Sequence, residues 1–439
     1  MKLKPNIDDR EYEKFVYGPM GTSVKCSIGV SDTSIIDAFG RLRVSNPVTL
    51  FDSKNIYNNP DLALSEENVP LFFDNQEVSG TGTATEFEPN KSEQLLSVSA
   101  DTAGTRVRQT KMRFNYQPGK SQLAILTFNL FGRNDGITKR EGIFDDDNGL
   151  FIELSDDVYV VQRSKATGSV VDTKVAQSDW NIDKMDGSGQ SGIELDFNKT
   201  QILLIDFEWL GVGRVRFGFV VNGITYYVHE FNNANNLTFA YMSTPNLPIR
   251  SEIDNDGTGQ ADKITQICST VISEGGSDDL GIIRYISTSG DEVRASTENT
   301  VYAVIGIKLK DNYLSASVNL LSLALQLQTP SHRCEWFVVL NPDIAGTFTY
   351  TGLSNSAIEF AKGVTANVVT GGTLITGGFI ESTGNPAGGA GGISEGINTA
   401  LRLGSTIAGV SDTMVLCVRP IGGSSNVDVE GSIIWRELV

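Results

Sequence analysis

Apolar and polar residues alternate most regularly over Gln201–Phe231, which predicts three consecutive antiparallel strands. Gln201–Trp209 is mostly apolar, and Arg214–Val221 places Val or Phe at every second position. Asn222-Gly223 supplies the positive φ angles of a two-residue type I′ turn, after which Ile224–Phe231 returns. An Asn-Gly pair between two alternating runs is a strong hairpin signal, so this stretch predicts a β-sheet scaffold.

Short apolar runs separated by Gly, Asn and Asp recur on both sides of this stretch, within residues 76–280. Such a series is typical of a jelly roll or another β-sandwich. The further strands predicted in this domain are Glu93–Ser99, Arg106–Phe114, Gln122–Asn129, Ile143–Phe144, Gly149–Ser155, Val158–Ser164, Ser169–Val175, Gly192–Asp196, Ala240–Ser243, Ile249–Ile253 and Lys263–Ser273.

Residues 301–439 predict a second, smaller β-sandwich domain, and the polar residues 281–300 predict a linker before it. The clearer strands here are Val301–Leu309, Ser317–Gln328, Cys334–Leu340, Ala357–Phe360, Met414–Pro420 and Glu430–Glu437. Gly384–Gly392 is a glycine-rich loop, either mobile or held against another chain, and Ser394–Leu403 fits a short helix or a strand. If the loop contacts a neighbouring subunit, it should be cleaved quickly in monomer and slowly in an assembly.

Residues 1–75 predict an N-terminal arm and a connector that packs on the next domain. Short strands are expected at Thr22–Ile28, Arg41–Ser45 and Thr49–Asp52, with a turn at Asn46-Pro47. The fold class is therefore all-β: a jelly-roll or β-sandwich domain followed by a second, smaller β-sandwich.

Charge and composition exclude several classes of function. The chain of 439 residues has a net charge of −18 and no cluster of Lys and Arg beyond Lys139-Arg140, which argues against nucleic acid as a partner. The N-terminus lacks the apolar core of a signal peptide, and no run of eighteen apolar residues predicts a membrane span. The two histidines and the scattered cysteines predict neither a metal site nor disulfides, but buried thiols of a protein made in a reducing cytoplasm: Cys26, Cys268, Cys334 and Cys417.

Asp206 and Glu208 lie two apart on a predicted strand, so both carboxylates face the same side. One class of jelly-roll glycoside hydrolases holds its nucleophile and its acid/base in this way. Their motif requires a third acidic residue two positions before the aspartate, where this chain has Leu204. We therefore favour a polar strand face, with Asp206 or Glu208 paired to Arg214 or Arg216 across the hairpin.

The remaining polar features predict structure rather than chemistry. Asp145–Gly149 and Asp254–Gly257 supply close oxygen ligands for Ca²⁺, but their spacing departs from that of the EF-hand, so we expect solvated turns. His229 is expected to be structural, and the tryptophans are expected to be core residues rather than sugar platforms: Trp180, Trp209, Trp336 and Trp435. No nucleophile, zinc or phosphate-loop motif is present. We predict no catalytic, cofactor or metal residues, and no enzyme.

Several long segments, in order, resemble structural proteins of tailed bacteriophages and of some large aquatic viruses. The resemblance covers about residues 37–280 and implies a non-enzymatic virion component, with no catalytic residues to carry over. The segments are DAFGRLRVSNPVTLFDSK (Asp37–Lys54), Arg108–Thr110, Tyr116–Gln122, Arg140–Glu153, QSDWNIDKMDGSGQSGIELD (Gln177–Asp196), DFEWLGVGRVRFGF (Asp206–Phe219), Ser243–Ile253 and Ile267–Gly276.

The leading hypothesis is a capsid decoration or head-fibre protein on the particle surface, assembled in the host cytoplasm. Its expected partners are other copies of itself, with a trimer as the usual symmetry, and other virion proteins. One alternative is a tail fibre or other tail protein that binds host glycans. The other is a carbohydrate-active enzyme that uses Asp206 and Glu208.

Overall fold

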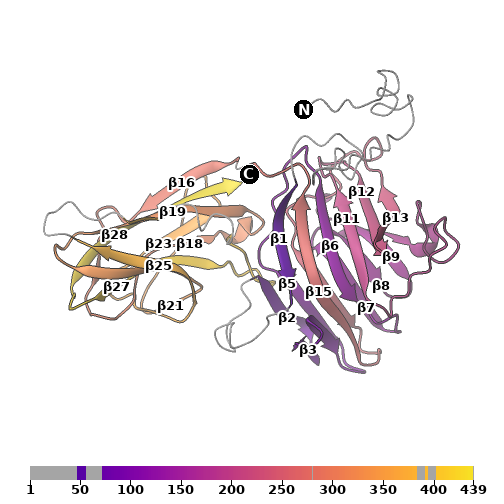
Figure 1. The fold of residues 1–439 in the computed structure, drawn as a ribbon, viewed down its shortest axis with the longest axis horizontal. Helices are drawn as coiled ribbons and strands as arrows, with labels where there is room; N and C mark the ends of the chain where they lie inside the picture. The colour runs from indigo at the N-terminus through magenta and orange to yellow at the C-terminus, as the bar shows by residue number, and fades with distance from the viewer. Residues whose placement is uncertain (1–46, 56–71, 279, 383–390, 394–401, 439) are drawn as a thin grey trace, which may run out of the picture.

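The computed structural model describes residues 47–55, 72–278, 280–382, 391–393 and 402–438. Almost all regular structure in these residues is β-strand, and two single-turn 3₁₀ helices, Gln177–Asp179 and Asp311–Tyr313, are the exceptions. None of the helices in this part of the chain is long and apolar enough to cross a membrane. Figure 1 shows two β bodies side by side, the first half of the chain on the right and the second on the left.

The first body is a sandwich of two antiparallel sheets. Sheet I contains β1 (Val48–Lys54), β3 (Thr83–Glu88), β4 (Glu93–Val98), β6 (Gln122–Asn129), β11 (Gln201–Phe207), β12 (Val215–Val221), β13 (Ile224–Phe231) and β15 (Asp262–Ser273). Its order is β13-β12-β11-β6-β15-β4-β3, and β1 pairs with the second half of β15. Sheet II, in the order β10-β9-β8-β7-β14-β5-β2, contains β2 (Phe73–Gly80), β5 (Gly104–Thr110), β7 (Ile137–Phe144), β8 (Gly149–Leu154), β9 (Val158–Ser164), β10 (Val171–Ala176) and β14 (Ile249–Asn255).

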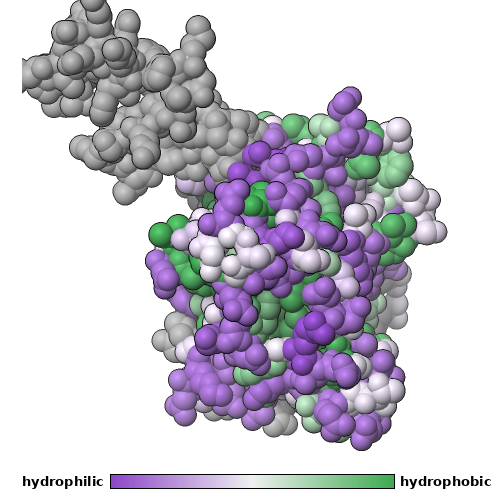
Figure 2. Space-filling model, turned by 90° about the vertical axis from the view of Figure 1, so that its right-hand side faces the viewer, coloured by the Kyte–Doolittle hydropathy of each residue, from purple (hydrophilic) through white to green (hydrophobic). Residues whose placement is uncertain are grey.

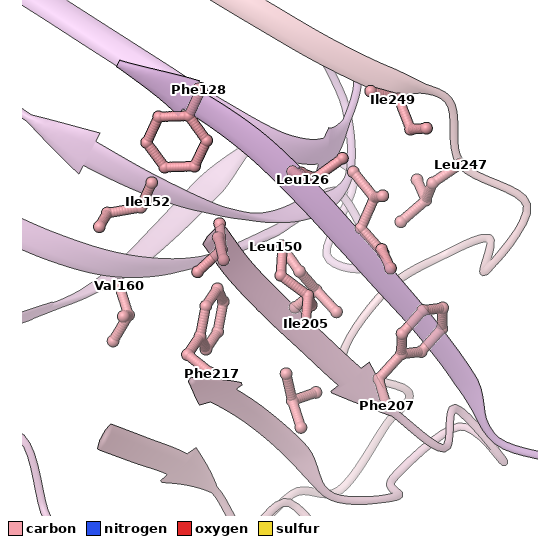
Figure 3. Packing of buried hydrophobic residues seen from close by; sticks show 14 of the residues in the cluster. Leu126, Phe128, Leu150, Ile152, Val160, Ile205, Phe207, Phe217, Leu247 and Ile249 are labelled. Carbon is pink, nitrogen blue, oxygen red and sulfur yellow. The ribbon is translucent and has the colours of Figure 1, made fainter. Parts of the chain in front are cut away.

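Alternation along each strand sends one set of side chains into the space between sheets I and II. Leu126, Ile205 and Phe217 of sheet I meet Leu150 and Ile152 of sheet II there (Figure 3). All five are fully buried. The predicted all-β class and the jelly-roll sandwich are therefore confirmed for this half of the chain.

The second body contains two larger sheets. Sheet III contains β16 (Ile282–Ser287), β17 (Val293–Ala295), β19 (Ser317–Leu327), β26 (Gly391–Ile393) and β28 (Val427–Leu438), in the order β16-β28-β19-β26 with β17 on β28. Sheet IV, in the order β22-β23-β18-β27-β20-β25, contains β18 (Tyr302–Leu309), β20 (Arg333–Leu340), β22 (Thr351–Gly352), β23 (Ile358–Lys362), β25 (Thr373–Glu381) and β27 (Thr413–Ile421). A small pair, β21 (Asp343–Ile344) and β24 (Val369–Thr370), lies beside them. Trp435 and Val338 are in the buried core of this body.

The hairpin prediction is confirmed at its turn. β12 and β13 pair antiparallel with Val221 opposite Ile224, and both turn residues, Asn222 (φ 54°) and Gly223 (φ 77°), have positive φ. The strands predicted on either side coincide with β11, β12 and β13 to within two residues.

Replacing Gly223 with alanine is expected to destabilise the protein by about 1 kcal/mol. A Cβ at this position meets open space, so the cost is the left-handed backbone conformation alone. Urea unfolding measures the loss, and Asn222→Gly, which keeps that conformation accessible, is the control expected to change stability little. Equal stability of the wild type and Gly223→Ala would contradict the conformational argument.

Several strand predictions are wrong, and each error has a local reason. Gly192–Asp196 and Ala240–Ser243 belong to no strand, because their apolar residues are buried from loops; Met242 is fully buried. The strands β2 and β3 were not expected, because these edge strands are mainly polar. The eight-residue β7 begins six residues before the predicted Ile143, since its first half carries Thr, Lys, Arg and Glu.

The stretch 281–300, predicted as a linker, contains β16 and β17, which both pair with β28. The polar residues of this stretch lie mainly between and after the two strands, and β16 itself is mostly apolar. Of the predicted Gly384–Gly392 loop, the last two residues belong to β26, and the rest lies outside the described residues. The predicted strands Thr22–Ile28 and Arg41–Ser45 also lie outside them, as does nearly all of Ser394–Leu403.

A buried ion pair joins the two bodies. The Nζ of Lys111, just after β5, lies 3.2 Å from Oδ1 of Asp412, just before β27, and both side chains are 5% exposed. The Ser405 amide donates to the Lys111 carbonyl, and the Ile407 amide donates to Asp74. Residues 404–412 of the second body are thus bound to the ends of β2 and β5 of the first.

Candidate functional site

Asp206 lies on the outer face of sheet I. Leu203, Ile205 and Phe207 of β11 point into the core, so Asp206 points away from it. Arg216 is its partner across the hairpin, as the sequence predicts. The guanidinium contacts Oδ2 of Asp206 through Nη2 at 2.5 Å and Nε at 3.2 Å.

Tyr227 completes this outer-face group. Its hydroxyl donates to the same oxygen, Oδ2 of Asp206, at 3.2 Å, and the Arg216 guanidinium lies over its ring at 4.1 Å. Oδ1 of Asp206 has no hydrogen-bond partner although the side chain is fully buried. Burial raises the pKa of Asp206 to about 6, against the opposing effect of the Arg216 charge.

Glu208, two positions after Asp206, is held through its backbone. It follows the end of β11, where its amide donates to the Arg214 carbonyl. The position two before Asp206 holds the buried, apolar Leu204. Asp206 is held by a guanidinium and a phenol, so the arrangement is that of an ion pair on a strand face.

The aspartates of the acidic turn Asp145–Gly149 form ion pairs with Arg and Lys side chains of the protein. Asp145 binds Arg113, and Asp146 lies 2.8 Å from Arg250. Asp147 lies 2.9 Å from the Lys165 ammonium. Each carboxylate of the turn thus has a positive partner within the protein.

In the turn Asp254–Gly257, side chains bind the backbone of the turn itself. Oδ1 of the Asn255 side chain accepts from the backbone amides of Gly257 and Gly259. Oδ1 of Asp256 accepts from the Thr258 amide. Within the described residues no group of three or more His, Cys, Asp or Glu side chains is arranged to hold a metal ion.

His229 and three of the four tryptophans are buried. His229 is buried, accepts from the Asn181 amide at 3.3 Å, and burial lowers its pKa to about 4. Trp209 is half-buried, and its indole donates to the Met242 carbonyl. The other three tryptophans are buried: Trp180, Trp336 and Trp435.

Of the three cysteines that the structure describes, one differs from the predicted burial, and Cys26 lies outside the described residues. Cys334 and Cys417 are buried, and burial raises the pKa of Cys334 to about 12. Cys268, on β15, is exposed. It lies on the face of sheet I that points away from the core. Strand alternation alone does not predict which of the two faces a residue of this strand takes.

Charged side chains also lie between the two sheets, which the sequence reading missed. Arg108, Ser251 and Glu141 are cross-strand neighbours on the inner face of sheet II. The Arg108 Nε donates to Oε1 of Gln266 in sheet I at 2.7 Å. The alternation of the strand could have indicated this position. Glu141 lies an even number of residues from the apolar Ile137 and Ile143, so it shares their face of the strand.

This inner row is incompletely paired. Neither carboxylate oxygen of Glu141 has a hydrogen-bond partner, nor do the Ser251 hydroxyl and the amide nitrogens of Gln94 and Gln266. Burial raises the pKa of Glu141 to about 8 and lowers that of Arg108 to about 9. The row lies between sheets I and II.

An open cleft of about 500 Å³ lies at one end of the sandwich, lined by Arg133, Glu194, Asp196 and Lys199 among others. Its charged groups are of both signs, and Lys199 lies 3.2 Å from Asp196. Figure 2 shows one side of the first body as mainly hydrophilic, with hydrophobic side chains visible between the polar ones. Nothing in its lining identifies a ligand.

A hydrophobic surface is present on the second body instead. β16 ends the order of sheet III, so among the described strands only one of its edges is paired, with β28. Four large apolar side chains at this edge are between 46% and 70% exposed: Leu280, Ile282, Ile283 and Tyr285. An exposed apolar edge strand is a template for pairing with another chain.

Comparisons with known proteins found distant structural similarity only. No protein-family model matches the sequence, and no curated protein matches it. Solved structures that resemble about half of the chain include a mixed-linkage glucan GH16 protein of Bacteroides ovatus in complex with product (10% identity, 51% of this chain and 99% of that one, TM-score 0.32). Another is the CBM2 module of the evolved Dit of Lactobacillus casei BL23 phage J-1 (6% identity, 53% and 98%, TM-score 0.33). A third is the carbohydrate recognition domain of Emp46p (11% identity, 47% and 89%, TM-score 0.26).

The protein is therefore an all-β chain, about half of which forms a jelly-roll sandwich of two antiparallel sheets, with further β-sheets beyond it.

Proposed function

We propose that the chain is a non-enzymatic structural protein of a virus particle, a capsid decoration or head-fibre component that assembles with copies of itself. The observation that carries the proposal is the apolar edge of β16, where Leu280–Tyr285 exposes side chains and backbone suited to pairing with another chain. The ordered segments over residues 37–280 that resemble virion proteins support the same assignment.

The β16 edge gives a direct test of assembly. The double variant Ile283→Lys/Tyr285→Lys is expected to dissociate the oligomer, a trimer in our proposal, because charged side chains oppose strand-to-strand association. Light scattering after gel filtration measures the mass. The matched control is Phe379→Lys, which changes a 75%-exposed residue on the edge strand β25 of sheet IV. A monomeric wild type, or dissociation by the control instead, would contradict the assembly role of β16.

An image of the virus particle is needed to determine where the protein lies in it. Copies that match capsid vertices or hexamers support decoration, whereas a few fibres at the tail support the alternative of a tail protein that binds host glycans. Absence of the chain from purified particles contradicts both.

The second alternative is a carbohydrate-active enzyme, and the geometry favours it less. Arg216 and Tyr227 hold Asp206, and Leu204 stands where a third acidic residue is required. The test is incubation of purified protein with host polysaccharide. Release of reducing ends that stops in Glu208→Gln would overturn the structural proposal.

A further inference from the structure

Three polar side chains meet where the two bodies join. Lys111 follows β5 of the first body, whereas Asn341 follows β20 and Asp412 precedes β27 in the second. Oδ1 of Asp412 accepts from the Lys111 ammonium at 3.2 Å and from the side-chain nitrogen of Asn341 at 2.7 Å. The lysine amine and the asparagine amide therefore share one carboxylate oxygen.

The Lys111 ammonium makes few hydrogen bonds for a buried group. Its side chain is 5% exposed, and Asp412 is the one acceptor that the described residues give it, although an ammonium has three protons to donate. Transfer of one proton to Asp412 converts the ammonium into a neutral amine, which is a nucleophile toward a carbonyl carbon.

The side-chain amide of Asn341 is arranged to react with such an amine. Its Oδ1 accepts from the Thr413 backbone amide at 2.7 Å and from the Thr413 hydroxyl at 3.5 Å. Donors on a carbonyl oxygen stabilise the oxyanion that forms when a nucleophile adds to the carbon. Its Nδ2 lies beside Asp412, a group that can return a proton to it. Asn341 is exposed, so ammonia released there can reach solvent.

A second set of the same three residue types shows what distinguishes the first. Oδ2 of Asp262 accepts from the Lys139 ammonium and from Nδ2 of Asn134, each at 2.6 Å. Lys139, however, also donates to the carbonyls of Leu130 and Gly132, so all three of its protons are bound. Within the described part of the chain no hydrogen bond reaches Oδ1 of Asn134. We therefore expect this second set to remain unreacted.

We propose that Lys111 and Asn341 form an isopeptide bond, with Asp412 as the proton carrier. Asp412 takes one proton from the ammonium, and Nζ of Lys111 attacks Cγ of Asn341. The Nζ–Cγ bond forms and the Cγ–Nδ2 bond breaks. Both protons released at Nζ pass to Nδ2, which leaves as an ammonium ion, and Asp412 returns to the carboxylate. Nothing is oxidised or reduced, and no co-reactant is needed.

The reaction starts from the ion pair of the newly folded protein. Attack requires Nζ and Cγ to approach to about 3–3.5 Å, and rotation about the four-carbon side chain of Lys111 supplies this approach. The bond accumulates with time and joins the two bodies covalently. Because it forms once in each chain, it does not make the protein an enzyme, and the inference does not depend on the proposed function.

Mass spectrometry of the full-length protein tests the bond. After incubation the wild type is expected to lose the mass of one ammonia per chain, and its tryptic digest should contain one pair of peptides linked at Lys111 and Asn341. The linked pair is decisive, because Asn-Gly sequences also lose ammonia when they form a succinimide. Asn341 cannot do so, since Pro342 has no backbone N–H to attack it.

Two variants remove the reacting groups. Lys111→Arg keeps the positive charge without an amine, and Asn341→Gly removes the amide but still allows the left-handed backbone of this position (φ 50°). Neither should give linked peptides. Asn134→Ala, from the second set, is the matched control and should form the link as the wild type does. Circular dichroism that matches the wild type shows that each variant is folded.

Three results would overturn the proposal. The first is incubated wild type without linked peptides. The second is a link between Lys111 and Asp412 with loss of water, because Asp412 is then the group that reacts. The third is a linked pair at Lys111 that persists in Asn341→Gly.

Discussion

Replacing Glu141 with glutamine is expected to stabilise the protein at pH 8 by several kcal/mol, on the order of 4 kcal/mol. Glu141 is buried between the sheets, and burial raises its pKa from 4.5 to about 8 against the opposing effects of the Ser251 hydroxyl and the Arg108 charge. The folded protein therefore holds a proton on Glu141 that the unfolded chain releases near pH 4.5.

The sign of the pH dependence follows from this difference. Between about pH 4.5 and 8 the folded state binds one more proton at Glu141 than the unfolded state, so the free energy of unfolding falls as the pH rises. The contribution is fully present below pH 4.5 and lost by about pH 8. Glutamine mimics the protonated side chain, so Glu141→Gln should match the wild type near pH 5 and exceed it increasingly toward pH 8.

Urea unfolding at a series of pH values from 5 to 8.5 measures this effect. Glu86→Gln is the matched control, because it is the same substitution at an exposed position of β3. A difference between wild type and Glu141→Gln that stays constant with pH would contradict an uncharged Glu141 in the folded protein.

Replacing Asp412 with alanine is expected to cost about 3–5 kcal/mol, because it leaves the buried Lys111 ammonium without a negative partner. Both side chains are 5% exposed, and Asp412 also accepts from the Asn341 amide at 2.7 Å. Since the pair joins the two bodies, the variant should also separate one unfolding transition into two. Calorimetry measures both effects.

Two comparisons isolate the buried charge as the cause. The double variant Lys111→Met/Asp412→Leu removes both charges and should recover most of the lost stability. Glu381→Ala breaks the exposed pair Arg333–Glu381 and should cost less than about 1 kcal/mol. Equal losses from Asp412→Ala and Glu381→Ala would show that the buried pair does not hold the bodies together.

The sequence predicts strands best where alternation is regular and turn residues are specific. The β12–β13 hairpin follows from Asn222-Gly223, and the ion pair of Asp206 follows from the position of Arg216 across that turn. Polar edge strands such as β2 and β3 escape prediction, because few of their side chains enter the core and no apolar alternation marks them.

The inner polar row shows a different limit. Arg108 and Glu141 have the phase of core residues, but composition assigns charged residues to the surface. Only the facing sheet, which supplies Gln266, explains why Arg108 is inside. A contact between residues more than 150 positions apart cannot be predicted from the local pattern of apolar and polar residues.

The pairing of β1 with β15 constrains how the protein is made. Val48 finds its partner only at Ser273, and Phe51 enters the core from the same strand. During synthesis the early strands must wait until the ribosome has delivered more than two hundred further residues. Pairings this distant in sequence form slowly, so the nascent chain exposes apolar surface for most of its elongation. Productive folding of the jelly roll is therefore expected to begin only after β15 has left the ribosome.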